Sequence, residues 1–322
     1  MDLIYTDENR VDSGVLLDST FDLAFGADEN DFRCTVSLKD HCCSAGCYLY
    51  LEGTEYGGII DKLDVDTDAD TVSYEGRTWH GILAGKILCP DTGEDYLILS
   101  GEANAVLGQL IERTGLSDLF EAATEDSGIT ISSYRMNRYI DAYLGIRKML
   151  DSVSAKLKLM YNGIRVIVSA VPRIDYSQDE EWDSSQIGFR VKKNSCPVNH
   201  MVCLGKGELA EREVIHLYAD QDGNISYTQT FTGQSEITNV YDNANAESAD
   251  ELEQGGRERL QEAYDGASSV QVDFDSEEQE YDIGDIVGAR ETVTGVYVTR
   301  QIVKKIVTIN RKGINIEHKV GE

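Results

Sequence analysis

Basic residues are scarce in this chain of 322 residues. It has 29 Lys and Arg against 58 Asp and Glu, which gives a formal net charge of −29. A free-standing nucleic-acid-binding protein gains most of its affinity by neutralising phosphates with basic side chains, and an anionic membrane surface repels acids in the same way. The composition therefore argues against both classes of protein.

The sequence also lacks long apolar stretches, and its number of cysteines is odd. Met1 to Glu8 carry acids where a secretory signal needs basic residues and an apolar run. No segment approaches the roughly 18 apolar residues of a membrane-spanning helix. Seven cysteines are an odd number, which excludes a fully paired disulfide framework. We expect a soluble protein, made in the cytosol, whose thiols are mostly reduced.

Proline is rare as well, with three residues against 29 glycines. This balance suits β-sheets, because ladders need every backbone N–H and turns need glycine. With 41% hydrophobic residues and 17 tyrosines the chain has enough apolar area to build cores, so disorder is not expected. β-Rich runs predict residues 1–100 as a small barrel or sandwich, with a first strand at 33–38 and others at 48–51, 56–60, 62–70 and 71–74.

Residues 101–172 are predicted to form a small α+β domain. Apolar residues at helical spacing predict two helices, at residues 103–114, closed by Gly115, and at 139–154. An Asn-Gly pair at residues 162–163, between two β-rich runs, is typical of a hairpin with a type I′ turn, whose two central residues both need positive φ.

A second β domain is predicted at residues 173–322, after a polar linker at 175–181. It contains one inserted helix at 248–264, which a capping box beginning at Ser248 opens. Strands are expected at residues 188–192, 199–205, 213–219, 225–231 and 269–274 and within 283–317, where residues 299–310 and 314–316 are expected to form a closing hairpin. The fold class is thus mainly β with an α+β insertion.

The densest cluster of soft metal ligands is His41, Cys42, Cys43 and Cys47. A zinc site would need a second ligand pair, which is missing, and the plainer interpretation is a loop with partly buried thiols. A cysteine nucleophile would need a histidine beside it. His41, His80, His200 and His216 are candidates, but nothing in the sequence near any cysteine marks it as the partner of one of them. Paired carboxylates for glycoside hydrolysis carry no information among 58 acids.

Two further motifs imitate ligand-binding loops. Alternate acids, followed by Glu75, have the spacing of a calcium loop, but Ala69 stands where such a loop needs glycine; the acids are Asp64, Asp66, Asp68 and Asp70. A solvated acidic face is the plainer interpretation, and calcium binding stays open. Gly205-Lys206-Gly207-Glu208 lacks the spacing of a phosphate loop and is expected to be a turn between strands.

Several segments resemble one structural family. Residues 53–60 and 74–83, with Gly76-Arg77 and Gly81-Ile82-Leu83, look like the amino-terminal region of tail-hub proteins from long-tailed bacteriophages and prophages. Residues 199–209 with Arg212 resemble the strand and Gly-x-Gly-Glu turn of that family's second β domain. Residues 281–287 and the strands that follow, up to Ile316, are similar to its closing segment.

The resemblance implies two tube-like β-barrel domains per chain, at residues 1–100 and 173–322, with the α+β domain beside them. It implies a structural hub that forms a ring, in related hubs a trimer, between the tail tube and the distal tip. Other tail tube and tip proteins would be its partners, and DNA would pass through its channel without specific binding. Such a protein lies in the virion tail after assembly in the bacterial cytoplasm.

The same resemblance implies no catalytic residues, cofactor or metal, so we expect a structural protein and not an enzyme. A tail-associated cell-wall hydrolase and a receptor- or carbohydrate-binding tail-tip module are the alternatives.

The charge is unevenly placed along the chain. Residues 1–31 have nine acids and one base, Arg10, whereas the last strands are basic, with Arg290, Arg300, Lys304, Lys305, Arg311, Lys312 and Lys319. An acid-rich lumen would repel DNA. Opposed patches of this kind are expected to steer one subunit's end onto another's, with a merely solvated surface as the alternative.

Overall fold

The structure of the chain is a computed structural model. It describes residues 2–177, 182–183, 188–193, 197–246, 248–265, 268–273, 281–290 and 297–321. The described residues form two compact units. The first unit contains the residues up to Gly188, those within Asp273–Arg290 and those from Tyr297 onward. The second unit contains the residues from Phe189 to Val272. None of the described helices is long and apolar enough to span a membrane.

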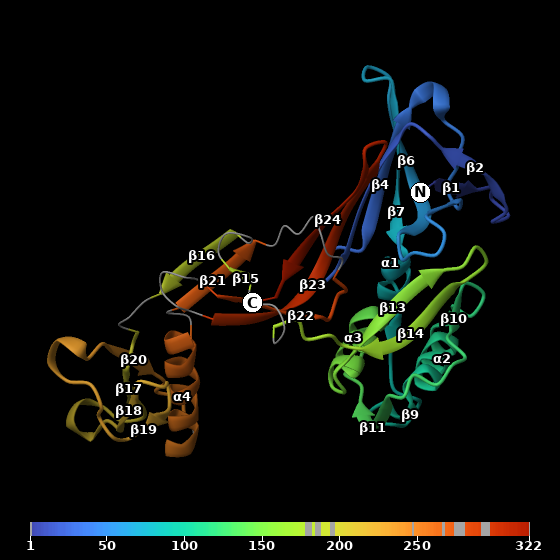
Figure 1. The fold of residues 1–322 in the computed structure, drawn as a ribbon. Coiled ribbons are helices and arrows are strands. Elements are labelled where there is room, and N and C mark those ends of the chain that lie inside the picture. Colours follow the sequence, from blue (N-terminus) through green and yellow to red (C-terminus); the bar gives the residue numbers. More distant parts are fainter. Residues whose placement is uncertain are drawn as a thin grey trace. The chain divides into compact units, whose positions relative to one another are not determined.

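A large, mostly antiparallel sheet dominates the first unit (Figure 1). Its strands lie in the order β15-β22-β23-β3-β4-β7-β6-β5-β1-β2, and β24 pairs with β23. Their bounds are β1 (Leu3–Thr6), β2 (Asp12–Leu16), β3 (Ser19–Gly26), β4 (Asp31–Ser37), β5 (Tyr48–Tyr50), β6 (Gly57–Asp66), β7 (Thr71–Thr78), β15 (Trp182–Asp183), β22 (Ile286–Arg290), β23 (Tyr297–Asn310) and β24 (Gly313–Val320). A short 3₁₀ helix, η1 (Leu38–Asp40), follows β4.

The carboxy-terminal strand β23 completes the amino-terminal sheet. It pairs antiparallel with β3, so that Val307 lies opposite Leu23. In β3 every second residue is apolar, and Phe21, Leu23 and Phe25 are all buried, as the two-residue period of a strand requires. Val307 joins these residues in one hydrophobic core. The closing hairpin predicted from the sequence is confirmed as β23 and β24.

The α+β part of the first unit is a three-stranded sheet, in the order β10-β14-β13, with two helices packed on it. The elements are β10 (Phe120–Ala122), β13 (Ala155–Tyr161), β14 (Val166–Pro172), α2 (Ala103–Thr114) and α3 (Ala142–Asp151). Beside them lie α1 (Trp79–Ala84) and two small pairs, β8 (Ile87–Leu88) with β12 (Ile140–Asp141) and β9 (Ile98–Glu102) with β11 (Thr130–Arg135).

Helix α2 has the predicted bounds, and Gly115 closes it with a φ of 71°, the left-handed conformation that favours glycine. Helix α3 is shorter than predicted. Tyr139 has a positive φ of 53°, and the Asp141 carboxylate caps the helix by accepting a 2.8 Å hydrogen bond from Leu144 N–H. The predicted β13–β14 hairpin is confirmed, but the prediction of a type I′ turn is wrong.

In that turn only Gly163 has positive φ, at 88°. Asn162 N–H donates to the Arg165 carbonyl at 3.0 Å, so four residues, 162–165, make the connection. The Asn162 side-chain oxygen accepts hydrogen bonds from the N–H groups of Ile164 and Arg165. This side-chain turn replaces the backbone geometry that an Asn-Gly pair usually gives.

The second unit is a four-stranded sheet with one helix, α4 (Ala249–Asp265), packed against it (Figure 1). The strands lie in the order β19 (Ile225–Ser226), β18 (Val214–Ala219), β17 (His200–Leu204) and β20 (Thr238–Asp242). A separate pair joins β16 (Gly188–Lys193) to β21 (Ser268–Asp273), and two 3₁₀ turns are η2 (Leu209–Glu211) and η3 (Gly233–Ser235). The predicted capping box is confirmed at Ser248, whose hydroxyl accepts from Glu251 N–H at 3.2 Å.

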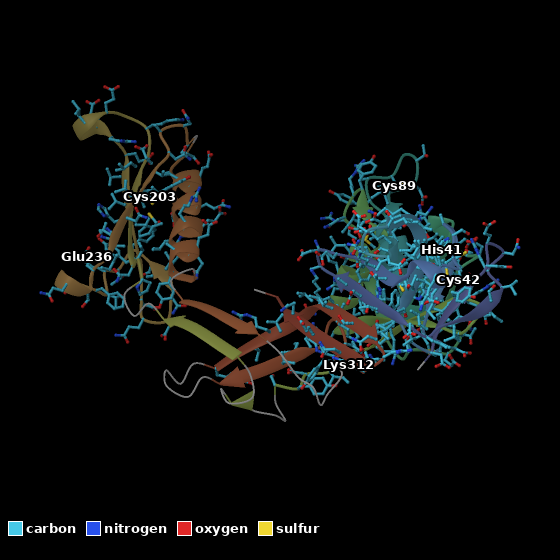
Figure 2. All side chains as sticks on the ribbon, turned by 90° about the horizontal axis from the view of Figure 1, so that it is seen from above. His41, Cys42, Cys89, Cys203, Glu236 and Lys312 are labelled. Atoms are coloured by element: carbon cyan, nitrogen blue, oxygen red, sulfur yellow. The ribbon has the colours of Figure 1, made fainter. Side chains whose placement is uncertain are left out.

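Glycine sets the distance between α4 and its sheet. A Cβ on Gly256 would lie 2.3 Å from the Cys203 sulfur, so only glycine allows this close approach. Cys203 is buried between the strands and the helix (Figure 2). It packs there with Met201 and Leu217 of the sheet and Leu252 of the helix.

Several strand predictions were wrong. The sequence placed the first strand at residues 33–38, yet β1, β2 and β3 precede it; acids at exposed positions such as Asp12 and Asp22 obscured their alternation. Residues 67–70 form a turn and not part of a strand, and residues 225–231 are a strand only at Ile225–Ser226. The predicted linker at residues 175–181 lies partly outside the described residues.

Mainly β structure with an α+β insertion is confirmed, but two barrels are not. Among the described strands the large sheet runs from β15 to β2 and that of the second unit from β19 to β20, so these pairings close no ring. The compact units also differ from the three predicted domains. Residues 1–100 and 101–172 share one core, and the strands predicted within 173–322 are divided between both units. Three independently folding domains remain a prediction for limited proteolysis to test.

Replacing Val307 with alanine tests whether the carboxy-terminal strand belongs to the amino-terminal core. Val307 is fully buried among Phe21, Leu23 and their neighbours, so Val307→Ala is expected to lower the free energy of unfolding by about 2 kcal/mol. Ile314→Ala on β24 is the control, because Ile314 is 39% exposed and should change stability by less than about 0.5 kcal/mol. Equal effects in urea unfolding would contradict the shared core.

Candidate functional site

A cleft of about 610 Å³ opens in the first unit, and Glu55, Lys156 and Asp282, which belong to a network of charges, are among the residues that line it. Its walls come from α3, from β13, from the turn at residues 53–56 and from residues 282–284, with Gln301, Ile314 and Ile316 of β23 and β24. Clefts of this size with convergent polar groups are the usual places where proteins bind a ligand or partner.

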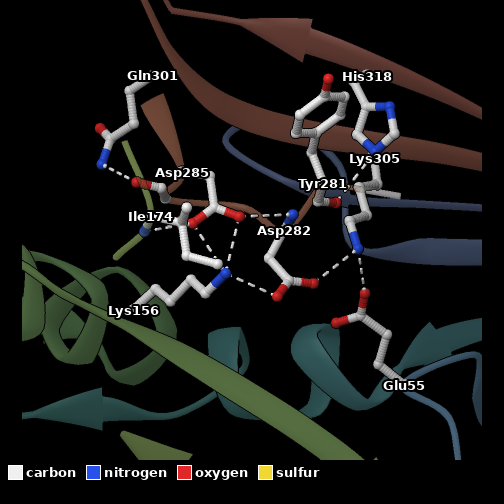
Figure 3. Close-up of polar contacts among 10 residues, drawn as sticks. Glu55, Lys156, Ile174, Tyr281, Asp282, Asp285, Gln301, Lys305 and His318 are labelled. Carbon is white, nitrogen blue, oxygen red and sulfur yellow. Dashed lines mark hydrogen bonds and ion pairs between the residues drawn. The ribbon is translucent and has the colours of Figure 1, made fainter. Parts of the chain in front are cut away.

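Lys156 of β13 is one centre of the network (Figure 3). Its ammonium group donates to both carboxylate oxygens of Asp285, at 2.8 and 2.7 Å, and to Asp282 at 2.7 Å. The Lys156 side chain is 4% exposed and that of Asp285 is 1% exposed. Asp285 also accepts from the backbone N–H groups of Ile174 and Asp282, at 2.9 and 3.0 Å, so its oxygens are well satisfied.

Lys305 of β23 is the second centre, and its side chain is 1% exposed. Its ammonium group donates to Glu55 at 2.8 Å and to Asp282 at 3.2 Å. Asp282 therefore bridges the two lysines (Figure 3). Glu55 follows β5, Lys156 lies in the α+β part and Lys305 near the end of the chain, so the network joins three segments that are distant in sequence.

Two lysines face three carboxylates here, and the contacts lower the pKa values of two of them, Glu55 and Asp282. Burial alone would raise the pKa of Glu55, but the nearby Lys305 charge and the contact with His80 lower it to about 2. Burial likewise opposes the charge of Asp282, yet Lys305 and Lys156 hold its pKa below the usual value. Because Glu55 and Asp282 stay ionised at neutral pH, neither is a proton donor there.

His80 of α1 lies beside Glu55, with its Nε2 3.5 Å from a carboxylate oxygen. Its ring stacks on Phe25 at 4.2 Å and meets Tyr143 edge-on at 5.3 Å. Burial lowers the pKa of His80, so the imidazole is neutral at pH 7. Its Nδ1 is buried without a hydrogen-bond partner among the described residues. These contacts of His80 join α1 to Glu55, to β3 through Phe25 and to α3 through Tyr143.

The predicted cysteine cluster forms no ligand set. Cys42 and Cys43 have their sulfurs 3.6 Å apart, while His41 instead contacts the Tyr74 hydroxyl at 3.0 Å. Among the described residues no three His, Cys, Asp or Glu side chains are placed to hold a metal ion. No hydrogen bond between described residues joins a cysteine to a histidine. Cys196 lies outside them.

The predicted calcium spacing belongs to the β6–β7 hairpin. Asp66 ends β6, and its carboxylate accepts from the N–H groups of Asp68 and Ala69, both at 2.9 Å. Asp64 pairs with Arg33 at 3.3 Å. Glu75 pairs with Lys62 and Arg33, and Asp70 has a positive φ of 55°. The Asp66 carboxylate thus stabilises the turn, and the carboxylates of Asp64 and Glu75 form ion pairs with Arg33 and Lys62.

The Gly205–Glu208 motif is confirmed as a turn between β17 and β18. Gly205 N–H donates to the Glu213 carbonyl and Glu213 N–H donates to the Lys206 carbonyl, which closes the loop. Gly207 has a φ of 95°. Nearby, His200 contacts His216 at 2.8 Å and Glu236 at 2.7 Å, so this histidine pair is one that the sequence did not predict to meet.

The basic strands meet the acidic amino-terminal region within one chain. Lys304 pairs with Glu29 at 2.9 Å, and Arg311 pairs with Asp18. Lys305 is buried in the network described above. Part of the predicted contrast between acidic and basic ends is therefore neutralised within the chain, and these paired charges are not left to steer a second subunit.

The network itself was missed at the sequence level. Lys156 stands in an alternating Lys-Leu run that reads as an exposed strand face, and a single lysine gives no sign that it will be buried. Asp282 and Asp285 lay in a segment noticed only for its family resemblance. Only the pairing of β23 with β3 brings Lys305 to Glu55.

Removing the Lys305 charge should destabilise the protein and reverse its response to acid. Lys305→Met leaves Glu55 buried without its strongest partner, which should cost about 3 to 5 kcal/mol at pH 7. In the unmodified protein the pKa of Glu55 is lowered from 4.5 to about 2, so this stabilisation is full above pH 4.5 and is lost as the pH falls toward 2. In the variant burial raises that pKa, so stability should fall as the pH rises above 4.5.

Lys39→Met is the matched control, because Lys39 is exposed and has no ion pair among the described residues. Urea unfolding at several pH values measures both the loss of unfolding free energy at pH 7 and its dependence on pH. An identical pH profile in Lys305→Met and the control would contradict the assigned pairing.

Thiol labelling should separate the cysteines by burial. Cys42 and Cys89 are exposed, whereas Cys34 and Cys43 are buried (Figure 2 labels the exposed pair). Burial raises the pKa of Cys34 to about 12 and, with the neighbouring Cys42, raises that of Cys43. Since the thiolate is the reactive form, iodoacetamide followed by peptide mass spectrometry should find Cys42 and Cys89 modified first. Labelling of Cys34 at the same rate would contradict this core.

Comparisons with known proteins identify the fold. No protein-family model matches the sequence, and no curated protein matches it. The prophage tail protein gp18 from Listeria monocytogenes EGD-e matches in structure with a TM-score of 0.50 and 12% identity, over 99% of this chain and 94% of that one.

Two further solved structures match at lower scores. The 43 kDa tail protein of prophage MuSo2 from Shewanella oneidensis has a TM-score of 0.47 and 9% identity, over 100% of this chain and 98% of that one. A tail protein from Neisseria meningitidis MC58 has a TM-score of 0.45 and 11% identity, over 100% of this chain and 96% of that one. From the match to gp18, the chain has the fold of a prophage tail protein, and the resemblance seen in the sequence is confirmed at the level of the fold.

Proposed function

We propose that this protein is a structural component of a phage or prophage tail. The observation that carries the proposal is the match to the Listeria prophage tail protein gp18, which extends over 99% of this chain and 94% of the other. A match of this extent covers almost the whole of both chains, and not one short motif. Fold likeness alone does not assign a role, so the role rests also on the chemistry of the chain.

That chemistry favours a structural role over an enzymatic one. The charge network holds carboxylates that stay ionised and lysines that are already paired. The described histidines contact carboxylates, aromatic rings or each other and no cysteine. Both features suit a protein that holds a shape, and they favour the structural role over the hydrolase alternative.

In its finer form, the proposal is a hub that forms a ring, by analogy a trimer, between the tail tube and the distal tip. Two tube-like β domains per chain would give such a ring six-fold character. Among the described strands, β2 pairs with β1 alone at one end of the large sheet, which supports this arrangement because ring formation between copies removes free strand edges. An acidic surface of charge −29 suits a channel that DNA passes without binding.

Light scattering with negative-stain imaging tests the ring. The chain has a mass of 35.7 kDa, and we expect particles of about three times that mass that image as rings, either alone or with the tail-tube protein added. Monodisperse monomer under both conditions, at all concentrations, would count against the hub. Release of sugars or peptides from purified cell wall, abolished by one acid or cysteine replacement, would favour the hydrolase.

A further inference from the structure

Cys42 and Cys43 bring two thiols into contact on the loop that leads into β5. Their sulfurs lie 3.6 Å apart. Cys42 is exposed, whereas Cys43 is buried in the hydrophobic core of the large sheet. A reagent in solution therefore reaches one thiol of the pair directly, and the second thiol lies against the sulfur that has reacted.

The Tyr74 hydroxyl sets the backbone conformation that brings these neighbours together. In an extended chain successive side chains point to opposite faces, which would separate the two sulfurs. Here the N–H groups of Cys42 and Cys43 both donate to the Tyr74 hydroxyl, at 3.0 and 3.4 Å. Tyr74 lies in β7 and is fully buried. Two successive N–H groups that converge on one oxygen curve the backbone, so the sulfurs meet.

The two thiols are expected to react in a fixed order. The thiolate is the form that attacks a disulfide, and Cys42 is the accessible thiol of the pair. Burial raises the pKa of Cys43, and a charge on the neighbouring Cys42 raises it further. Once the Cys42 sulfur is bonded to another sulfur it carries no charge, so this second obstacle to a Cys43 thiolate disappears. Cys42 therefore reacts first and Cys43 second.

We propose that Cys42 and Cys43 are a reversible redox modification site, which a small disulfide such as oxidised glutathione converts to a disulfide between the two residues. The Cys42 thiolate attacks one sulfur of the reagent, and one glutathione thiolate leaves. The Cys43 thiolate then attacks the Cys42 sulfur, and the second glutathione thiolate leaves. Two protein thiols are oxidised and one small disulfide is reduced, and the two protons that the protein loses are taken up by the two glutathione thiolates.

A bond between neighbours in sequence is easy to reverse. Adjacent Cα atoms are about 3.8 Å apart across a trans peptide, and the usual distance in a disulfide is about 4.4 to 6.8 Å. The bond would therefore be strained, and strained or exposed disulfides are the labile ones. Such a bond suits a modification that responds to the surroundings, and not a permanent cross-link.

The modification would act beside the amino-terminal strands. Ser44 follows the pair, and its hydroxyl donates to Glu8 at 3.0 Å. Glu8 lies between β1 and β2. A bond between Cys42 and Cys43 would thus alter the loop that contacts this connection. The proposal goes beyond the role in the tail and does not depend on it, since it follows from the positions of the two thiols.

Oxidised glutathione, added to the folded full chain, tests the site. Alkylation of the remaining thiols, followed by peptide mass spectrometry with fragmentation, shows which cysteines are paired. We expect the peptide with Cys42 and Cys43 to lose the mass of two hydrogen atoms and to retain little glutathione. Cys89 is the control within the same chain, because it is exposed and no described thiol forms a hydrogen bond with its sulfur. It should retain glutathione, and dithiothreitol should reverse both reactions.

Two alanine variants identify the thiol that acts second. In Cys43→Ala this thiol is absent, so the fraction of Cys42 that retains glutathione should rise at least about tenfold. Cys47→Ala removes another buried thiol of the same core and should leave the yield of the Cys42–Cys43 bond within about twofold. Thermal unfolding shows whether each variant is folded, and the pairing in the unmodified protein decides the question even without them.

Four outcomes would overturn the proposal. These are no reaction at Cys42, retention of glutathione on Cys42 to the same extent as on Cys89, a disulfide that joins either residue of the pair to a different cysteine, and equal retention on Cys42 in Cys43→Ala and the unmodified protein. Each of them concerns the thiols alone, so none bears on the light-scattering measurement that tests the tail role.

Discussion

The pairing of two buried lysines with three carboxylates is the constraint on which the first unit depends. A charged side chain loses several kcal/mol of hydration on burial, and only close partners restore it. Lys305 can be buried because Glu55 and Asp282 meet it, and Lys156 because Asp282 and Asp285 do. One end of the chain, one early turn and one strand of the α+β part must therefore reach the same place for any of them to be stable there.

The large sheet has the same long-range character. β23 pairs with β3, and Val307 packs with Phe21 and Leu23, so the last strands finish a core that the first residues begin. Acidic and basic ends also meet in this sheet, where Lys304 pairs with Glu29. Part of the charge contrast that suggested contacts between subunits is therefore used within one chain.

Much of the local structure was predictable because it rests on near neighbours. The apolar spacing and Gly115 gave the bounds of α2, Ser248 gave the start of α4, and alternation gave the β13–β14 hairpin. The turn at Asn162 was wrong in type because its side chain made hydrogen bonds that competed with the expected backbone geometry. The strands before residue 33 were missed, and two of them, β2 and β3, carry an acid at an exposed position, Asp12 and Asp22. The histidine, cysteine and acid clusters looked equivalent in sequence, since contacts with Tyr74, Glu55 or Glu236 appear only after folding.

The sequence by itself determined the mainly β character, the helices and turns, the excess of negative charge and the likeness to tail proteins, because composition, periodicity and short motifs carry that information. Only the tertiary structure decided which charges are buried and that the two ends of the chain share a sheet. These features depend on pairings between distant residues, such as Lys305 with Glu55, 250 positions apart, and Thr308 with Asp22, 286 positions apart. The free energy of such a contact depends on burial, which no local pattern records.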